Sequence, residues 1–200
     1  MRCLIVAVLF TMLSCVSNET KIGDYENPQK ALLVMDMQID FIGESAKFPI
    51  DVDRIDDLVN TTNRIIEECH NRNYIIIYIR NTFKENDWLN TFRNNAAIKG
   101  TLGAEIDPRI NIISENIFDK YSLSAFSNSD FEVFLIENQI NELYLCGVMA
   151  DQCVFETAIA AFNRNYTVNY IANAVSSTNT KKIENAIKRL NKKGINVIEL

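Results

Sequence analysis

Short runs of mainly apolar residues recur along the chain and predict buried strands. They lie at residues 31–35, 74–79, 142–148 and 168–171, with a shorter run at 116–118 and a last one at 195–200. Runs of this length that do not alternate with polar residues are typical of strands covered on both faces, as in a parallel sheet.

Between these runs the apolar positions change to a helical spacing. The clearest set follows the first run: Val52, Ile55, Leu58, Val59, Thr62, Ile65, Ile66 and Cys69. Further helices are expected over about 151–164 and 180–192, and one over 130–138 with Asp130 as its N-cap. Strands that alternate with helices predict a three-layer α/β/α fold with a mostly parallel, doubly wound sheet of five to six strands.

One connection is much longer than the others. Residues 81–109 are mostly polar and contain Gly100, Gly103 and Pro108. This composition indicates a long functional loop, with room for a short helix near Trp88.

The first fifteen residues have a different character. Arg2 precedes an apolar run that ends at Leu13, and Ser14-Cys15 follows. The pattern is that of a secretory signal, and Cys15 stands where bacterial lipoprotein signals place the lipidated cysteine. We therefore expect a signal at 1–15, a polar tether at 16–29 and the folded domain at 30–200. The protein would be exported, either periplasmic or held at the membrane through Cys15. The alternative is a start codon placed too far upstream, which would leave a cytoplasmic protein.

Composition narrows the function classes. The chain has 200 residues, of which 48% are apolar, so one domain can bury a full core. The formal net charge is −6 and basic residues are scattered, so a nucleic-acid-binding surface is not expected. His70 is the only histidine. It lies at the end of a predicted helix, which disfavours both a multi-histidine zinc site and a cysteine–histidine pair. Cys69 and Cys146 are expected to be packed thiols.

Three chemically capable residues follow predicted strands. Asp36 ends the first strand, Lys120 the third, and Cys153 comes just after the fourth. Ligands bind at the carboxyl ends of the strands in a doubly wound sheet, so these residues are candidates for one site. Cys153 lies in the first turn of a predicted helix, where unpaired N–H groups and the helix dipole favour a thiolate. Asp36 would accept the thiol proton, and Lys120 would supply electrostatic activation.

Each of these residues also has a purely structural interpretation. A lone cysteine is most often a buried thiol, and Asp36 and Lys120 can be a turn residue and a solvated lysine. A redox-active thiol protein, or a non-catalytic small-molecule binding protein on the same fold, is the alternative function. Residues 36–40 contain no glycine, so no nucleotide-binding loop follows the first strand, and no cofactor is expected.

Four segments carry recognisable patterns in order: residues 33–41, 120–126, 147–154 and 157–161. The first three contain D-x-Q-x-D-F, K-x-x-x-S-A-F and G-V-x-x-D-x-C-V. Together they resemble the isochorismatase-like cysteine hydrolases, a superfamily that includes nicotinamidases and amidohydrolases of carbamoyl and ureido compounds. The resemblance covers nearly all of residues 30–175.

The resemblance implies a catalytic triad of Asp36, Lys120 and Cys153. It also implies a cis peptide between Val148 and Met149, which would place the Met149 and Cys153 N–H groups as an oxyanion hole. Gln38 and Asp40 are expected to position the loop more than to react, and Asp151 to fix the turn or cap the helix. A homo-oligomer is also implied.

Departures from the family pattern narrow the chemistry. Nicotinamidases bind a metal through an aspartate and several histidines, but residues 79–88 contain no histidine. True isochorismatases cleave a vinyl ether without needing a cysteine, and this chain retains Cys153. We therefore expect a metal-independent amidase or ureidase that acts on a small molecule through a thioester. The candidate substrate contacts are Gln38, Phe41, Trp88 and Phe155, with Phe83 as a further pocket residue.

Overall fold

The computed structural model describes residues 20–200. The expected signal at 1–15, Cys15 and the first part of the tether lie outside these residues. From residue 20 to β1 the chain has no regular secondary structure, but the Ile22 N–H donates to the Arg164 carbonyl at 2.9 Å and the Ile22 side chain packs against the core. The described part of the tether therefore lies against the domain. No helix within residues 20–200 is long and apolar enough to cross a membrane.

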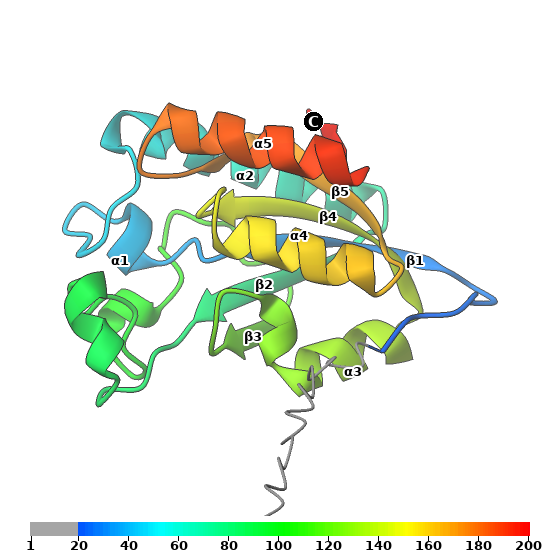
Figure 1. The fold of residues 1–200 in the computed structure, drawn as a ribbon, viewed down its shortest axis with the longest axis horizontal. Coiled ribbons are helices and arrows are strands. Elements are labelled where there is room, and N and C mark those ends of the chain that lie inside the picture. The colour runs from blue at the N-terminus through cyan, green and yellow to red at the C-terminus, as the bar shows by residue number, and fades with distance from the viewer. Residues whose placement is uncertain (1–19) are drawn as a thin grey trace, which may run out of the picture.

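Six parallel strands form a single sheet in the order β3-β2-β1-β4-β5-β6 (Figure 1). Their bounds are β1 Gln29–Met35, β2 Ile75–Asn81, β3 Ile117–Lys120, β4 Ile140–Val148, β5 Thr167–Ser176 and β6 Asn196–Ile198. The predicted α/β/α fold class is confirmed. The order reverses between β1 and β4, which is the point where ligand sites open in doubly wound sheets.

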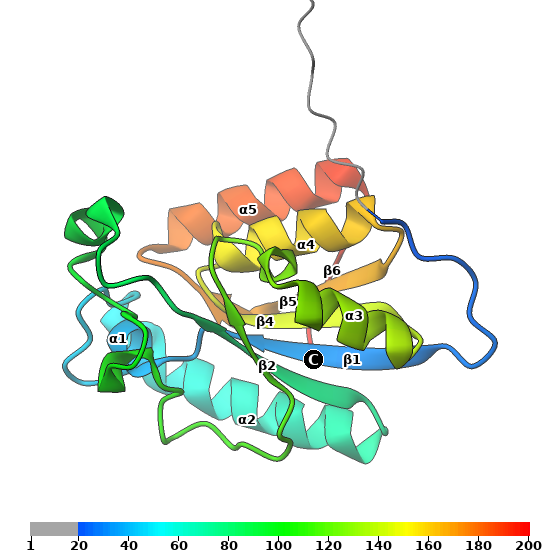
Figure 2. The same ribbon diagram turned by 90° about the horizontal axis from the view of Figure 1, so that it is seen from below.

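Helices cover both faces of the sheet (Figure 2). One face is covered by α2 (Ile55–Asn71), and the other by α3 (Ser129–Glu137), α4 (Cys153–Asn163) and α5 (Thr180–Lys193). Successive residues of β1 enter opposite cores: Leu33 packs with α3, α4 and α5, whereas Leu32 and Val34 pack with α2. Because both faces are covered, the strand is apolar at every one of these positions.

Two local features differ from expectation. A four-residue helix, α1 (Ile39–Ile42), follows β1 and is too short to show a periodic pattern. The N-cap of α3 is Asn128, whose side chain accepts the N–H groups of Asp130 and Phe131. Asp130 is therefore not the cap. It lies in the first turn, where its carboxylate is favourably placed against the helix dipole.

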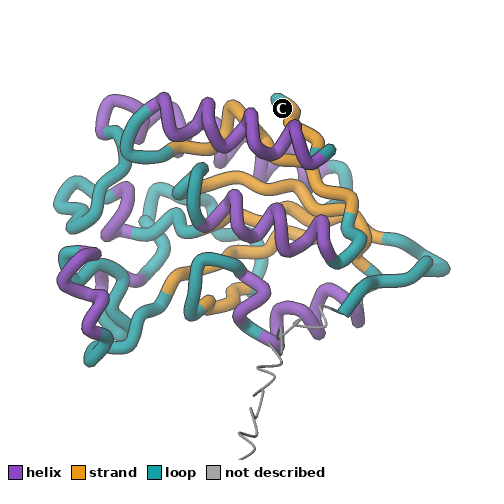
Figure 3. Tube along the Cα trace, in the orientation of Figure 1, coloured by secondary structure: helices purple, strands orange, loops and turns teal. Residues whose placement is uncertain are grey.

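The long loop after β2 contains the expected short helix, a 3-10 helix over Trp88–Arg93, and a second one over Leu102–Ala104. The strand arrows of Figure 1, together with the loops marked in Figure 3, show that loops gather with α1 at the end of the sheet toward which the strands point. This end of the molecule carries the candidate site.

Candidate active site

Asp36, Lys120 and Cys153 meet at the carboxyl end of the sheet, and all three are buried. The Lys120 ammonium lies 3.1 Å from an Asp36 carboxylate oxygen and donates to the Cys153 sulfur at 3.2 Å. It also donates to the Ser122 carbonyl at 3.0 Å, which fixes its position. The lysine thus bridges a buried acid and a buried thiol.

Each of the three residues is placed by the end of a regular element. Asp36 follows the last residue of β1 in a left-handed conformation, with φ of 53°, and its N–H still bonds to the Ile79 carbonyl of β2 at 2.8 Å. Lys120 is the last residue of β3, and Cys153 is the first of α4. The Cys153 N–H therefore has no acceptor within its own helix.

A tight turn joins β4 to α4. Gly147 has φ of +111°, and a Cβ at this position would lie 2.0 Å from the Met35 carbonyl oxygen. Only glycine fits here, because both the conformation and the close approach of β1 exclude a side chain. One residue further on, the peptide bond between Val148 and Met149 is cis, as the sequence resemblance implies.

The turn is tied to the end of β5. The Ala150 N–H donates to the Ser176 carbonyl at 2.8 Å, and the Tyr170 hydroxyl donates to the Ala150 carbonyl at 2.9 Å. The Ser177 hydroxyl donates to the Asp151 carboxylate. Asp151 thus fixes the turn, the first of the two roles considered from the sequence, and Cys153 is held at the sheet edge.

The electrostatics of the site differ from the sequence expectation. Burial raises the pKa of the Cys153 thiol to about 12, because the attraction of Lys120 does not compensate for lost solvation and the Asp36 charge opposes a thiolate. Burial also raises the pKa of Asp36, against the lowering influence of Lys120. For Lys120 burial lowers the pKa, but the charges of Asp36 and Cys153 outweigh it and raise the pKa overall. Burial thus acts against the thiolate that the start of a helix favours.

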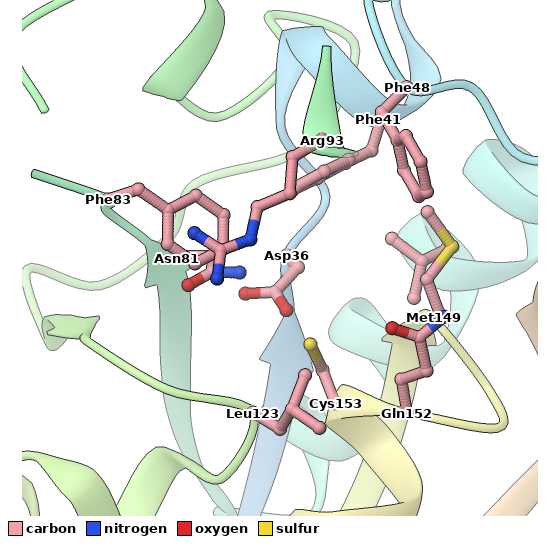
Figure 4. Close-up of a pocket in the computed structure, with 11 residues that line it drawn as sticks. Asp36, Phe41, Phe48, Asn81, Phe83, Arg93, Leu123, Met149, Gln152 and Cys153 are labelled. Carbon is pink, nitrogen blue, oxygen red and sulfur yellow. The ribbon is translucent and has the colours of Figure 1, made fainter. Parts of the chain in front are cut away.

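A pocket of about 470 Å³ opens above the three residues. Its apolar wall consists of Phe41, Phe48, Phe83, Leu123, Val148 and Met149, and its polar lining of Asp36, Asn81, Arg93, Gln152 and Cys153. In Figure 4 the Cys153 sulfur and the Asp36 carboxylate face each other, with Phe41, Phe48 and Met149 on one side and Phe83, Asn81 and Arg93 on the other. An apolar pocket with a few convergent polar groups is typical of a site for a small organic molecule.

Of the four residues expected to contact substrate, only Phe41 lines this pocket. Trp88 is 75% exposed and packs edge-on against Phe92 outside it. Phe155 is buried in the core, where the Arg189 guanidinium lies over its ring at 4.0 Å. Placing Trp88 and Phe155 in the pocket was wrong, because the aromatic residues pack on a loop surface and against α5.

Gln38 has a structural position instead. Its side-chain amide donates to the carbonyls of Asn81 and Ala104, at 2.9 and 2.6 Å, and accepts the Asn81 N–H at 2.8 Å. Asp40 acts in the same way, since its carboxylate accepts the Ala97 N–H at 2.8 Å. Both side chains hold the long loop against α1, so Gln38 is not a pocket residue.

Five pocket residues were missed from the sequence: Phe48, Asn81, Arg93, Leu123 and Gln152. Asn81 is the last residue of β2, so the strand-end rule that found Asp36 and Lys120 could have found it as well. Arg93 lies in the long loop, where no periodic pattern points toward the sheet.

The metal site that the family resemblance suggests does not fit these residues. No group of three or more His, Cys, Asp or Glu side chains in the described part of the chain could hold a metal ion. The pocket wall beyond β2 carries Phe83 and Arg93, and a guanidinium repels a divalent cation. We derive no catalytic step through a metal.

The chain is similar to known proteins in both sequence and structure. A family model described as the isochorismatase domain matches residues 30–200. An uncharacterised isochorismatase family protein of Bacillus subtilis (strain 168) is 29% identical over 166 residues, which cover 76% of this chain and 88% of that protein. A nicotinamidase of Escherichia coli (strain K12) is 26% identical over 192 residues, which cover 80% of this chain and 88% of that protein. The structure of an isochorismatase-like hydrolase from Alkaliphilus metalliredigens matches with a TM-score of 0.78 at 25% identity, over 86% of this chain and 94% of that chain.

Proposed function

Because this chain belongs to the isochorismatase family, we propose that it hydrolyses a carbon–nitrogen bond of a small amide, carbamoyl or ureido compound through a thioester on Cys153, without a metal. The observation that carries the proposal is the Lys120 ammonium, 3.1 Å from Asp36 and 3.2 Å from the Cys153 sulfur, beneath an open pocket. A nucleophile, a base and a fixed charge are then in direct contact. The similarity to a nicotinamidase, named for its action on an amide, supports this bond type.

The first half of the reaction forms the thioester. Asp36 accepts the thiol proton as the Cys153 sulfur attacks the substrate carbonyl carbon, and the carbonyl oxygen takes up the negative charge. The backbone N–H groups of Met149 and Cys153, at the turn before α4, stabilise this oxyanion. Asp36 then gives its proton to the nitrogen, the carbon–nitrogen bond breaks, and ammonia or an amine leaves.

The second half uses water. Asp36 takes a proton from a water molecule as the water oxygen attacks the thioester carbonyl carbon. The carbon–sulfur bond breaks, the sulfur regains a proton from Asp36, and an acid product leaves. Throughout both halves Lys120 keeps its proton and offsets the negative charge that moves between Asp36 and Cys153.

Hydroxylamine partitioning tests the thioester. A panel of small primary amides and ureides is scored by ammonia release, and each active compound is then turned over with increasing hydroxylamine. We expect part of the free acid to be replaced by the hydroxamate, because hydroxylamine competes with water for an acyl enzyme. Formation of the free acid alone at every hydroxylamine concentration would contradict a thioester. A Cys69→Ala variant, which removes a buried thiol of α2, is expected to partition like the wild type.

The pH dependence tests the role of Asp36. Only the ionised carboxylate can accept the thiol proton, so kcat/KM is expected to fall as pH drops through the pKa of Asp36. Burial raises this pKa, so the midpoint should lie above the ordinary value of 3.8. The profile is measured with the best substrate of the panel, and circular dichroism over the same range excludes acid unfolding. A midpoint at or below 3.8 would rule out the buried carboxylate as the base.

A further inference from the structure

Arg93 is the one basic residue that lines the pocket, and two contacts fix its side chain. The guanidinium carbon lies 3.7 Å from the centre of the Phe83 ring, and Nη1 donates to an Asp87 carboxylate oxygen at 3.0 Å. The other Asp87 oxygen accepts the Leu89 N–H at 3.0 Å, which fixes the carboxylate in turn. The guanidinium is thereby held in a defined plane at the pocket wall (Figure 4).

This arrangement leaves most of the guanidinium available. The group has five N–H donors in a planar fork, and the bond to Asp87 occupies only one of its nitrogens. A planar fork of this kind matches a carboxylate, which it binds through two parallel hydrogen bonds.

Asn81 supplies a second polar group in the same pocket. Its side chain is only 3% exposed, and its Oδ1 atom has no hydrogen-bond partner among the described residues. The Asn81 backbone is already used, because Gln38 binds both its N–H and its carbonyl. A buried acceptor without a partner is unfavourable, so Oδ1 is placed to accept a hydrogen bond from an N–H or O–H group that enters the pocket.

The remaining charges do not compete for an anion. The charges of Asp36 and Lys120 balance each other in direct contact. Asp87, which pairs with Arg93, does not line the pocket, and the other wall residues carry no formal charge. Arg93 is therefore the group there that distinguishes an anionic ligand from a neutral one.

We propose that Arg93 binds a carboxylate on the substrate, and that the Asn81 Oδ1 atom accepts an N–H of the same molecule, so that the enzyme acts on a small amido or ureido acid. This inference rests on the proposed function and deepens it. In such a molecule the carboxylate is bound at the wall beyond β2, while the amide carbonyl lies against Cys153.

Two alkylating agents of nearly the same shape test the subsite without requiring turnover. Iodoacetate and iodoacetamide both transfer their CH2 carbon to a thiol, with loss of iodide and of the thiol proton, but only iodoacetate carries a carboxylate. The rate of Cys153 alkylation by each is followed by intact mass and peptide mapping. We expect Arg93→Met to lower the ratio of the iodoacetate rate to the iodoacetamide rate by about tenfold or more. The ratio for Arg93→Lys should lie between those of the wild type and Arg93→Met, because lysine keeps the positive charge but lacks the planar fork of donors.

The matched control is Arg64→Met, which removes an exposed arginine of α2 and should leave the ratio unchanged. A second measurement uses only the wild type, in case Arg93→Met is unstable. Propionate should protect Cys153 from iodoacetamide at about one tenth of the concentration needed with propionamide. A ratio within about twofold of the wild type in Arg93→Met, or equal protection by both compounds, would overturn the subsite.

These outcomes separate the subsite from the proposed function. A carboxylate preference in alkylation, without hydrolysis of any amide or ureide, would overturn the hydrolase and retain the anion site. Hydroxamate formation from neutral amides, with alkylation rates insensitive to Arg93, would retain the hydrolase and overturn the anion site.

Discussion

Replacing Cys153 by alanine is expected to lower kcat/KM by about 10⁴-fold or more. The sulfur is the only atom in the pocket placed to form a covalent bond with a substrate beside both Asp36 and Lys120, so its loss removes the thioester path. The side chain is small and buried, and its truncation should lower the free energy of unfolding by only about 1–2 kcal/mol. Ammonia release and urea unfolding measure the two effects separately.

Cys146→Ala is the matched control for this prediction. Cys146 is also a buried free thiol, on β4, but it packs in the core under α2. Its truncation should lower stability by a similar amount and leave kcat/KM within a few-fold of the wild type. Retention of more than a tenth of the activity in Cys153→Ala would reject covalent catalysis at this residue. Peroxide consumption that depends on Cys153, without any hydrolysis, would favour the redox alternative.

The buried pair of Asp36 and Lys120 carries the second large effect. Lys120→Met leaves the buried Asp36 carboxylate without its cation, and is expected to lower the free energy of unfolding by about 3–5 kcal/mol. Activity should fall as well, by at least about 10²-fold, because the charge that offsets Asp36 and Cys153 is lost. Urea unfolding and kcat/KM are measured on the same preparation.

A double-mutant cycle separates charge from packing. The double variant Asp36→Asn/Lys120→Met contains neither charge and should recover most of the lost stability, although it has no base and remains inactive. If the double variant loses as much stability as Asp36→Asn and Lys120→Met lose in sum, direct coupling between the two residues is contradicted. The exposed pair of Arg64 and Glu68 on α2 is the control, with an expected coupling of only about 0.3–0.5 kcal/mol.

The sheet and the large helices follow from the sequence for a physical reason. Residues 31–35 are apolar throughout because β1 is covered on both faces. In α2 the apolar residues recur every three or four positions, because only one side of the helix is buried. Asp36, Lys120 and Cys153 follow from the rule that parallel strands end at the same edge. The sequence alone does not determine the order of the strands, which depends on contacts between distant segments.

Most of the pocket wall does not follow from the sequence. Arg93 comes from the middle of a loop that neither repeats nor forms a long element, and its position depends on Phe83 and Asp87. Trp88 has the residue type of a binding contact but is exposed and does not line the pocket. Likewise, the pKa of Cys153 depends on how completely the thiol is buried, and the start of a helix does not reveal that.

Gln38 and Asp40 hold the far part of the long loop against the scaffold, through Ala97 and Ala104. The segment between Phe83 and Ala97, which includes Arg93, contributes no residue to the contacts that join Asp36, Lys120 and Cys153. Mutations can therefore accumulate in this segment without loss of the reactive residues. Selection for a new substrate can act on one short stretch of sequence, while selection for the reaction itself acts on another.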